Sequence, residues 1–230
     1  MRGTPFAVSG RRLAVLAGLA LVTLLCAAMV VVRMRATGTN EATGLLWNLF
    51  LGWLPLVFAL AVYDGHRRGW SVPALGASAG LWLLFFPNAP YLVTDLRHLG
   101  EWTAAPRMYD VLMLASAAFA GLALAFVSLY LLHAVARARF GAFSGWLAAL
   151  SALGLGAFGI FLGLYGRWNS WDLFTRPERL IAEIGRGFAD PLAYKRELAV
   201  VVLLAAFLTV GYLCFYAVRP TGLLESDDHR

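Results

Sequence analysis

Charge is scarce in this chain. Asp, Glu, Lys and Arg make up 14% of its 230 residues, and Lys195 is the only lysine, whereas about 25% of a typical soluble domain is charged. Apolar runs of about 20 residues, long enough to cross a bilayer, recur along most of the sequence and leave no room for a soluble catalytic domain. We predict one membrane-embedded domain over residues 1–220 and a solvated tail over residues 221–230.

Several catalytic motifs are also missing. The sequence contains no H-E-x-x-H, no G-x-S-x-G and no phosphate-binding P-loop, so the enzyme classes that these motifs mark are not indicated, and neither is a cofactor. The two cysteines, Cys26 and Cys214, lie inside apolar runs and are expected to pack as small hydrophobic side chains. The net charge of +6 comes from arginines beside apolar runs, as membrane topology requires, so nucleic-acid binding is not predicted.

The apolar runs predict an all-α fold, a polytopic transmembrane bundle of about six helices. The predicted spans are Leu13–Val32, Gly44–Tyr63, Val72–Tyr91, Tyr109–Leu132, Phe143–Tyr165 and Leu198–Val218. After the fifth span, Thr175-x-x-Glu178 forms a capping box followed by apolar residues at helical spacing. This pattern predicts an amphipathic helix over residues 175–189 that lies in the membrane interface.

Six spans place both termini on one side of the membrane, together with the predicted loops 64–71 and 133–142. That side carries nine basic residues and the other side carries ten, but six of these ten fall in the segment 166–197. Without that segment the positive-inside rule places both termini in the cytoplasm of a cell-membrane protein. The arginines of the amphipathic helix would suit an anionic cytoplasmic leaflet and favour the opposite orientation, which stays open.

The first polar motif runs from Phe86 to Leu99, at the outer end of the third span. Its two prolines, Pro87 and Pro90, lie within four residues and are expected to break the helix there. If an α-helix resumes afterwards, Tyr91, Asp95 and His98 share one face at positions i, i+4 and i+7. A phenol, a carboxylate and an imidazole on one face can relay a proton or hold a metal. The alternative is a hydrogen-bonded polar cap that closes the bundle.

The second polar motif is Arg167-Trp168-Asn169-Ser170-Trp171-Asp172, directly after the fifth span. The guanidinium of Arg167 is expected either to pair with Asp95 or Asp110 or to clamp a phosphate or carboxylate of a ligand. The alternative is an aromatic anchor in the interface with one ion pair. Asp110 stands at the start of the fourth span, where helix capping alone explains an aspartate.

Both motifs lie on the same predicted side of the membrane, which makes a shared site possible. The catalytic candidates are Asp95, His98 and Asp110, and the ligand-binding candidates are Asn88, Tyr91, Arg167, Asn169 and Asp172. A zinc site would need His98 with Asp95 and either Asp110 or Asp172, and the sequence assigns no metal firmly. Two small-residue pairs, Gly76-x-x-x-Gly80 and Gly159-x-x-x-Gly163, predict close helix packing within the chain, with self-association as the alternative.

These motifs carry a resemblance to a known family. The segments Trp82–Leu99, Gly159–Gly163 with Arg167–Asp172, Trp47–Leu49 with Leu54–Leu56, and Tyr109-Asp110 resemble the bacterial membrane proteins grouped as domain-of-unknown-function family 1361. The resemblance spans most of residues 44–190. It implies the fold of a membrane protein, but the family has no assigned activity, so the resemblance implies no mechanism.

Three functions remain open from the sequence. The first is a binding or scaffold bundle with a polar site at the outer interface, whose partners are the lipid bilayer and a lipid or other anionic headgroup. The second is a membrane-embedded enzyme for a lipid or lipid-linked substrate, with Asp95 and His98 as acid–base groups and Arg167 as the anion clamp. The third is a small-solute transporter, although no charged residue falls in the centre of a predicted span, which weighs against proton-coupled pumping.

Overall fold

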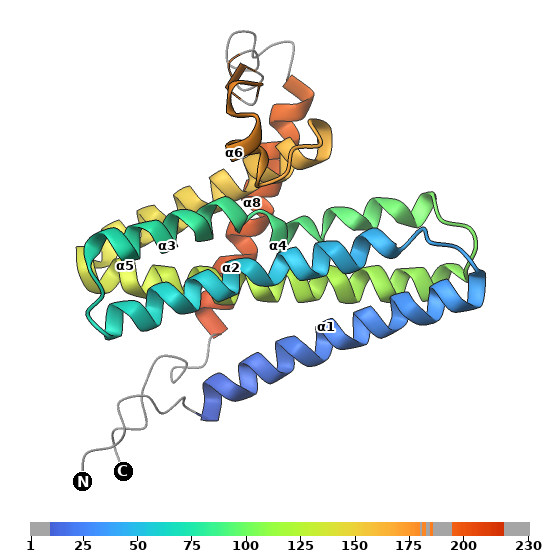
Figure 1. Cartoon of the computed structure of the whole chain (residues 1–230), viewed down its shortest axis with the longest axis horizontal. Coiled ribbons are helices and arrows are strands. Elements are labelled where there is room, and N and C mark those ends of the chain that lie inside the picture. The colour runs from blue at the N-terminus through green and yellow to red at the C-terminus, as the bar shows by residue number, and fades with distance from the viewer. Residues whose placement is uncertain (1–9, 180, 183–184, 186–194, 219–230) are drawn as a thin grey trace.

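The computed structural model describes residues 10–179, 181–182, 185 and 195–218, and within them the chain is all-α (Figure 1). The helices are α1 (Gly10–Thr37), α2 (Thr43–Arg67), α3 (Val72–Phe85), α4 (Asn88–Tyr91), the 3₁₀ helix η1 (Thr94–Gly100), α5 (Arg107–Tyr165), α6 (Asp172–Thr175) and α8 (Lys195–Val218). Among the described residues, five segments are long and apolar enough to cross a membrane. The predicted membrane helix bundle is therefore confirmed.

The helices differ in direction. In Figure 1, α1, α2, α3 and the first part of α5 run along the long axis of the molecule, whereas α8 crosses them. The second half of α8, where Leu208 and Tyr212 are buried, contacts α5. The hydroxyl oxygen of Tyr212 lies 2.9 Å from Nδ1 of His133 on α5. The sixth predicted span is thus present and is anchored on α5.

The fourth and fifth predicted spans are two parts of α5, which turns sharply at Gly141. The predicted loop 133–142 is wrong, because the helix continues through Phe140. Gly141 has φ 88° and ψ 170°, a conformation with positive φ that glycine adopts without steric penalty. Beyond the turn, Gly145 lies so close to Arg137 that an added Cβ would collide with it. With α5 divided at Gly141, the five candidate spans correspond to the six that the sequence predicts.

The third predicted span, Val72–Tyr91, is broken. α3 ends at Phe85, and the chain then forms the single turn α4 and the 3₁₀ helix η1. Pro87 and Pro90 have no amide hydrogen to continue an α-helix, and the side-chain amide of Asn88 donates to the Phe85 carbonyl instead, with Nδ2 and O 2.9 Å apart. The predicted break is confirmed. The α-helix expected after it is a 3₁₀ helix.

A row of glycines on the second part of α5 receives this broken segment. The pairs in contact are Gly156 with Phe86, Gly159 with Pro87, and Gly163 with Tyr91. A Cβ atom added at Gly156 would lie 2.8 Å from the Phe86 ring, and one added at Gly159 would overlap the ring of Pro87. Because only glycine lets the two backbones approach so closely, the packing predicted for Gly159-x-x-x-Gly163 is confirmed.

The other small-residue pair behaves differently. A Cβ added at Gly76 or Gly80 would meet no described atom within 4 Å, and both glycines line an open apolar groove between α3 and α5. The packing predicted for this pair within the chain is therefore wrong for the part that the structure describes, because the two helices diverge along this face.

Two predicted segments fall partly or wholly outside the description. Of the amphipathic helix predicted over residues 175–189, Thr175 is the last residue of α6 and Arg176 is not helical. Residues 177–179, 181–182 and 185 are helical, and the rest lie outside the described residues. The predicted tail over residues 221–230 also lies outside them.

The glycine row generates a prediction with an internal control. Gly159→Ala should reduce the free energy of unfolding by about 1–3 kcal/mol, because the new methyl group overpacks against the rigid ring of Pro87. Gly154→Ala, on the same helix with no described atom within 4 Å of the new Cβ, should be neutral or stabilising, since alanine favours helix over glycine by about 1 kcal/mol. Thermal unfolding in detergent, followed by circular dichroism, measures both. Equal melting temperatures for the two variants would contradict the packing.

Candidate functional site

The break in the third span is tied to the second polar motif by hydrogen bonds. The Asn88 side chain donates to Oγ of Ser170 at 3.0 Å, and the Ser170 hydroxyl donates to the Leu84 carbonyl, also at 3.0 Å. Ser170 therefore links the end of α3 to the loop after α5, although 86 positions separate it from Leu84. These two bonds hold the two motifs together, as the sequence predicts from their common side.

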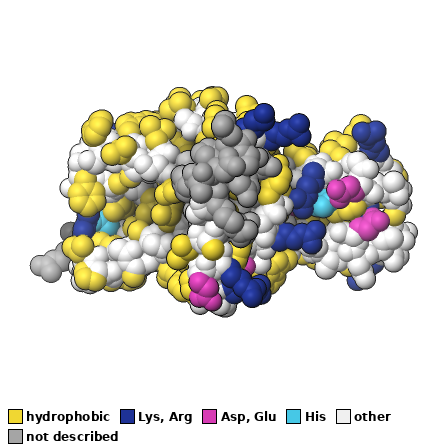
Figure 2. Space-filling view, turned by 90° about the horizontal axis from the view of Figure 1, so that it is seen from above, with side chains coloured by type: hydrophobic (Ala, Val, Ile, Leu, Met, Phe, Trp, Pro, Cys, Tyr) yellow, Lys and Arg dark blue, Asp and Glu magenta, His cyan; other side chains and the backbone are white. Residues whose placement is uncertain are grey.

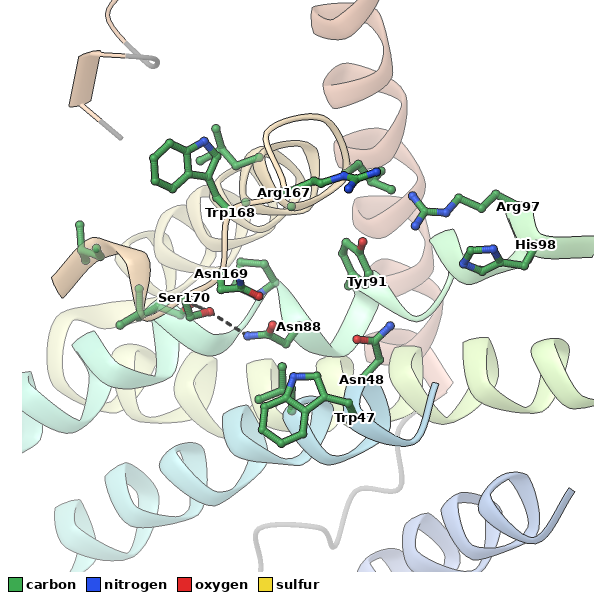
Figure 3. Close-up of a pocket in the computed structure, with 18 of the residues that line it drawn as sticks. Trp47, Asn48, Asn88, Tyr91, Arg97, His98, Arg167, Trp168, Asn169 and Ser170 are labelled. Carbon is green, nitrogen blue, oxygen red and sulfur yellow. Dashed lines mark hydrogen bonds between the residues drawn. The ribbon is translucent and has the colours of Figure 1, made fainter. Parts of the chain in front are cut away.

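A cavity of about 790 Å³ lies between the two motifs (Figure 3). This volume is within the range of about 300–1,000 Å³ that is usual for small-molecule sites. Its polar lining consists of Asn48, Asn88, Tyr91, Arg97, His98, Glu101, Arg167, Asn169 and Ser170. Five predicted site residues thus meet around one cavity: Asn88, Tyr91, His98, Arg167 and Asn169. Asp95, Asp110 and Asp172 do not line it.

Two arginines face this cavity from opposite sides. Arg97 comes from η1 and Arg167 from the turn after α5, and in Figure 3 their guanidinium groups point toward one another. Neither forms an ion pair with a described residue. Arg167 also has φ 54°, and non-glycine residues with positive φ concentrate at ligand-binding sites. Figure 2 shows several basic side chains beside a histidine and acidic groups on the right of the face that carries α6.

His98 is held between two carboxylates. Its Nδ1 lies 2.6 Å from Oε2 of Glu101, and its Nε2 lies 4.0 Å from Oδ1 of Asp95. The ring of Trp102 stacks on the imidazole, with centroids 4.9 Å apart and planes 5° apart. Asp95 itself is buried and accepts a hydrogen bond from the Asn48 amide at 3.0 Å. Asp95 does not line the cavity, but it contacts two residues that do, Asn48 and His98.

The 3₁₀ helix explains why Glu101 escaped the sequence analysis. An α-helix would align Tyr91, Asp95 and His98 at i, i+4 and i+7, but in a 3₁₀ helix the residues at i and i+3 eclipse one another. Asp95, His98 and Glu101 follow that spacing, so Glu101 takes the place expected for Tyr91 beside the imidazole. Their three-residue spacing was visible in the sequence, but nothing there indicated a 3₁₀ helix.

Asp172 caps its own loop. The backbone amide of Asn169 donates to Oδ2 of Asp172 at 2.8 Å, and the Thr175 hydroxyl lies 3.3 Å from Oδ1. The Asn169 amide lowers the pKa of the Asp172 carboxyl below its ordinary value, and Thr175 and Arg176 act in the same direction. Asp172 is therefore ionised at neutral pH, and it faces a second, smaller hollow of about 330 Å³.

Asp110 belongs to a buried ion pair outside the cavity. Nε of Arg33 donates to Oδ1 of Asp110 at 2.7 Å, and Nη2 donates to Oδ2 at 3.3 Å and to Oε2 of Glu41 at 2.9 Å. Arg33 is 1% exposed and Asp110 2%, and the guanidinium carbon lies 4.8 Å from the centre of the Trp102 ring. The predicted pairing of Asp110 with Arg167 is therefore wrong, because Arg33 occupies both carboxylate oxygens.

The candidate zinc ligands are not brought together. Asp110 is bound to Arg33, and Asp172 caps the loop after α5. Within the described residues, no group of three His, Cys, Asp or Glu side chains lies close enough to hold a metal ion. The cavity presents guanidinium, amide, hydroxyl and imidazole groups together with the carboxylate of Glu101, which lies against His98.

The buried ion pair allows a direct comparison with a half-exposed one. Arg33→Met leaves the Asp110 carboxylate buried without its cation, so the free energy of unfolding should fall by about 3–5 kcal/mol. Arg12→Met removes a pair with Asp64 whose side chains are 24% and 29% exposed, and should cost at most about 1 kcal/mol. The double variant Arg33→Met with Asp110→Leu should recover much of the loss. Detergent unfolding curves measure these differences, and similar losses in both single variants would contradict the role given to Arg33.

The comparisons with known proteins concern the same part of the chain. The family model described as "Protein of unknown function (DUF1361)" matches residues 47–211, which include every residue of the cavity. No curated protein and no solved structure matches the chain. Since the family model covers well over half of the chain, as the resemblance of the two polar motifs predicts, the chain belongs to the DUF1361 family.

Proposed function

We propose that the protein is a binding bundle of the cell membrane whose cavity holds an anionic group, a phosphate or a carboxylate, between Arg97 and Arg167. The observation that carries this proposal is the pair of guanidinium groups that point into one cavity without a described ion-pair partner. With the termini in the cytoplasm, as the distribution of arginines predicts, the cavity opens toward the outer face.

The chemistry of the cavity favours an anion over a cation or a neutral solute. A guanidinium is always charged and presents its donors as a planar fork, which matches a phosphate or carboxylate. Glu101 is the single acidic residue among the residues that line the cavity, and it lies against His98 at 2.6 Å. The amides of Asn48, Asn88 and Asn169 supply further polar contacts without adding negative charge.

Loss of either arginine should weaken anion binding. A hydrogen bond to a charged group contributes about 1.5–3 kcal/mol, so Arg97→Gln and Arg167→Gln should each raise the Kd for a phosphate-bearing ligand about ten- to a hundredfold. Arg107→Gln is the matched control, because Arg107 is exposed at the start of α5 and does not line the cavity. Native mass spectrometry with phosphatidic acid and with glycerol 3-phosphate gives the affinities. If the three variants bind both probes like the wild type, the proposed site is wrong.

One observation favours a second function, a membrane-embedded enzyme for a lipid or lipid-linked substrate. A histidine whose one nitrogen is held by a carboxylate is the usual arrangement of a general base, and His98 lines the cavity while Glu101 holds its Nδ1. The gap of 4.0 Å between Nε2 and Asp95 Oδ1 is too long for a direct hydrogen bond, so Asp95 does not hold Nε2.

The enzyme alternative has a specific signature. The purified protein would release inorganic phosphate from phosphatidic acid, with His98 taking the proton of the attacking water and returning it to the leaving alcohol. His98→Gln should abolish the release and retain phosphatidic acid binding, because Arg97 and Arg167 remain. A phosphate-release assay on both proteins tests the enzyme alternative. If the wild type releases no phosphate, that alternative is wrong and only the binding function remains.

A further inference from the structure

We infer that the ligand is a membrane amphiphile, whose headgroup lies in the cavity and whose hydrocarbon tail leaves it sideways between α2 and α6. This inference rests on the proposed anion site and adds the chemical class of the ligand. It depends on the apolar part of the cavity lining.

The cavity has two unlike ends. The charged residues of its lining, Arg97, His98, Glu101 and Arg167, come from η1, from the residue after it and from the turn after α5. We call Trp47 and Leu51 of α2, Leu84 of α3 and Leu173 of α6 the side wall. Leu162 and Leu164 at the end of α5 are further apolar lining residues outside it. A small polar anion would contact only the first end, and the volume of about 790 Å³ extends well beyond a single phosphate.

The side wall opens onto the outer surface of the bundle. Trp47 and Leu173 both line the cavity, yet they are 53% and 43% exposed. Both side chains are therefore accessible at the mouth of the cavity. Trp47 stands on α2 and Leu173 on α6, so we place the exit of the tail at the part of the mouth that these two helices form.

The surroundings of the opening are apolar. On α2, Trp47 continues into Phe50 and Val57, which are 55% and 53% exposed and follow on one face of a helix long and apolar enough to span a membrane. Next to α6, Trp171 meets Trp47 edge-on, with ring centroids 6.4 Å apart. Exposed apolar side chains on a spanning helix face hydrocarbon, and tryptophans mark the boundary with the headgroups.

An amphiphile satisfies both ends of the cavity at once. Its charged headgroup meets the two guanidinium groups, while its tail passes the side wall and stays in contact with hydrocarbon, so no apolar surface has to enter water. A water-soluble anion that filled the same cavity would leave Trp47, Leu51 and Leu173 facing a polar ligand. The charge at one end and the apolar opening at the other therefore select an anionic lipid.

The test compares one headgroup with and without its tail. Phosphatidic acid and glycerol 3-phosphate carry the same phosphate, and native mass spectrometry or calorimetry of the full-length protein in detergent gives a Kd for each. We expect the wild type to bind phosphatidic acid at least tenfold more tightly. Leu173→Gln, which places an amide in the side wall, should reduce this preference at least fivefold and leave glycerol 3-phosphate binding unchanged.

Leu150→Gln provides the matched control. Leu150 is 45% exposed on α5, close to the 43% of Leu173, but it does not line the cavity, so this variant should keep the wild-type preference. If glycerol 3-phosphate binds as tightly as phosphatidic acid, or if Leu173→Gln and Leu150→Gln behave alike, the side opening for a tail is refuted while the anion site stands. If neither probe binds, or if Arg97→Gln and Arg167→Gln change nothing, the anion site fails as well.

Discussion

The structure depends on a break in the third span that the prolines impose and the glycines of α5 accommodate. Pro87 and Pro90 end the α-helix before it has crossed the bundle, which leaves carbonyl groups without helical partners in an apolar environment. Asn88 satisfies one of them, and Gly156 and Gly159 allow the broken backbone to approach α5. The segment therefore stays folded as the short helices α4 and η1, which contribute Asn88, Tyr91, Arg97 and His98 to the cavity.

The charged side chains near this break fall into two groups with different roles. Arg33 and Asp110 are buried together, and a buried charge is tolerated in a protein only when it is paired. Their pair joins the end of α1 to the start of α5. Arg97 and Arg167 instead remain exposed at the cavity without an ion-pair partner among the described residues. The buried charges are thus neutralised within the fold, and the proposed anion site rests on the two arginines that are not.

The proposed exit for a lipid tail would join the cavity to the bilayer. The charged lining residues come from η1, from Glu101 and from the turn after α5, and the side wall comes from α2, α3 and α6. A soluble binding protein gains little from such an opening, but a membrane protein can receive a ligand from the bilayer without moving it through water. The hydrogen bonds of Ser170 keep the two ends in register, because they fix the turn after α5 to the end of α3.

The sequence by itself determined what depends on local chemistry: the number of spans, the break at Pro87 and Pro90, and the common side of the two polar motifs. Apolar length and missing amide hydrogens act on neighbouring residues, so their effects can be predicted without a structure. Only the tertiary structure decided which charges meet. Arg33 and Asp110 are 77 positions apart, and their pairing depends on the rotation and axial shift of packed helices. The 3₁₀ geometry that brings Glu101 to His98 likewise follows from packing beyond the break.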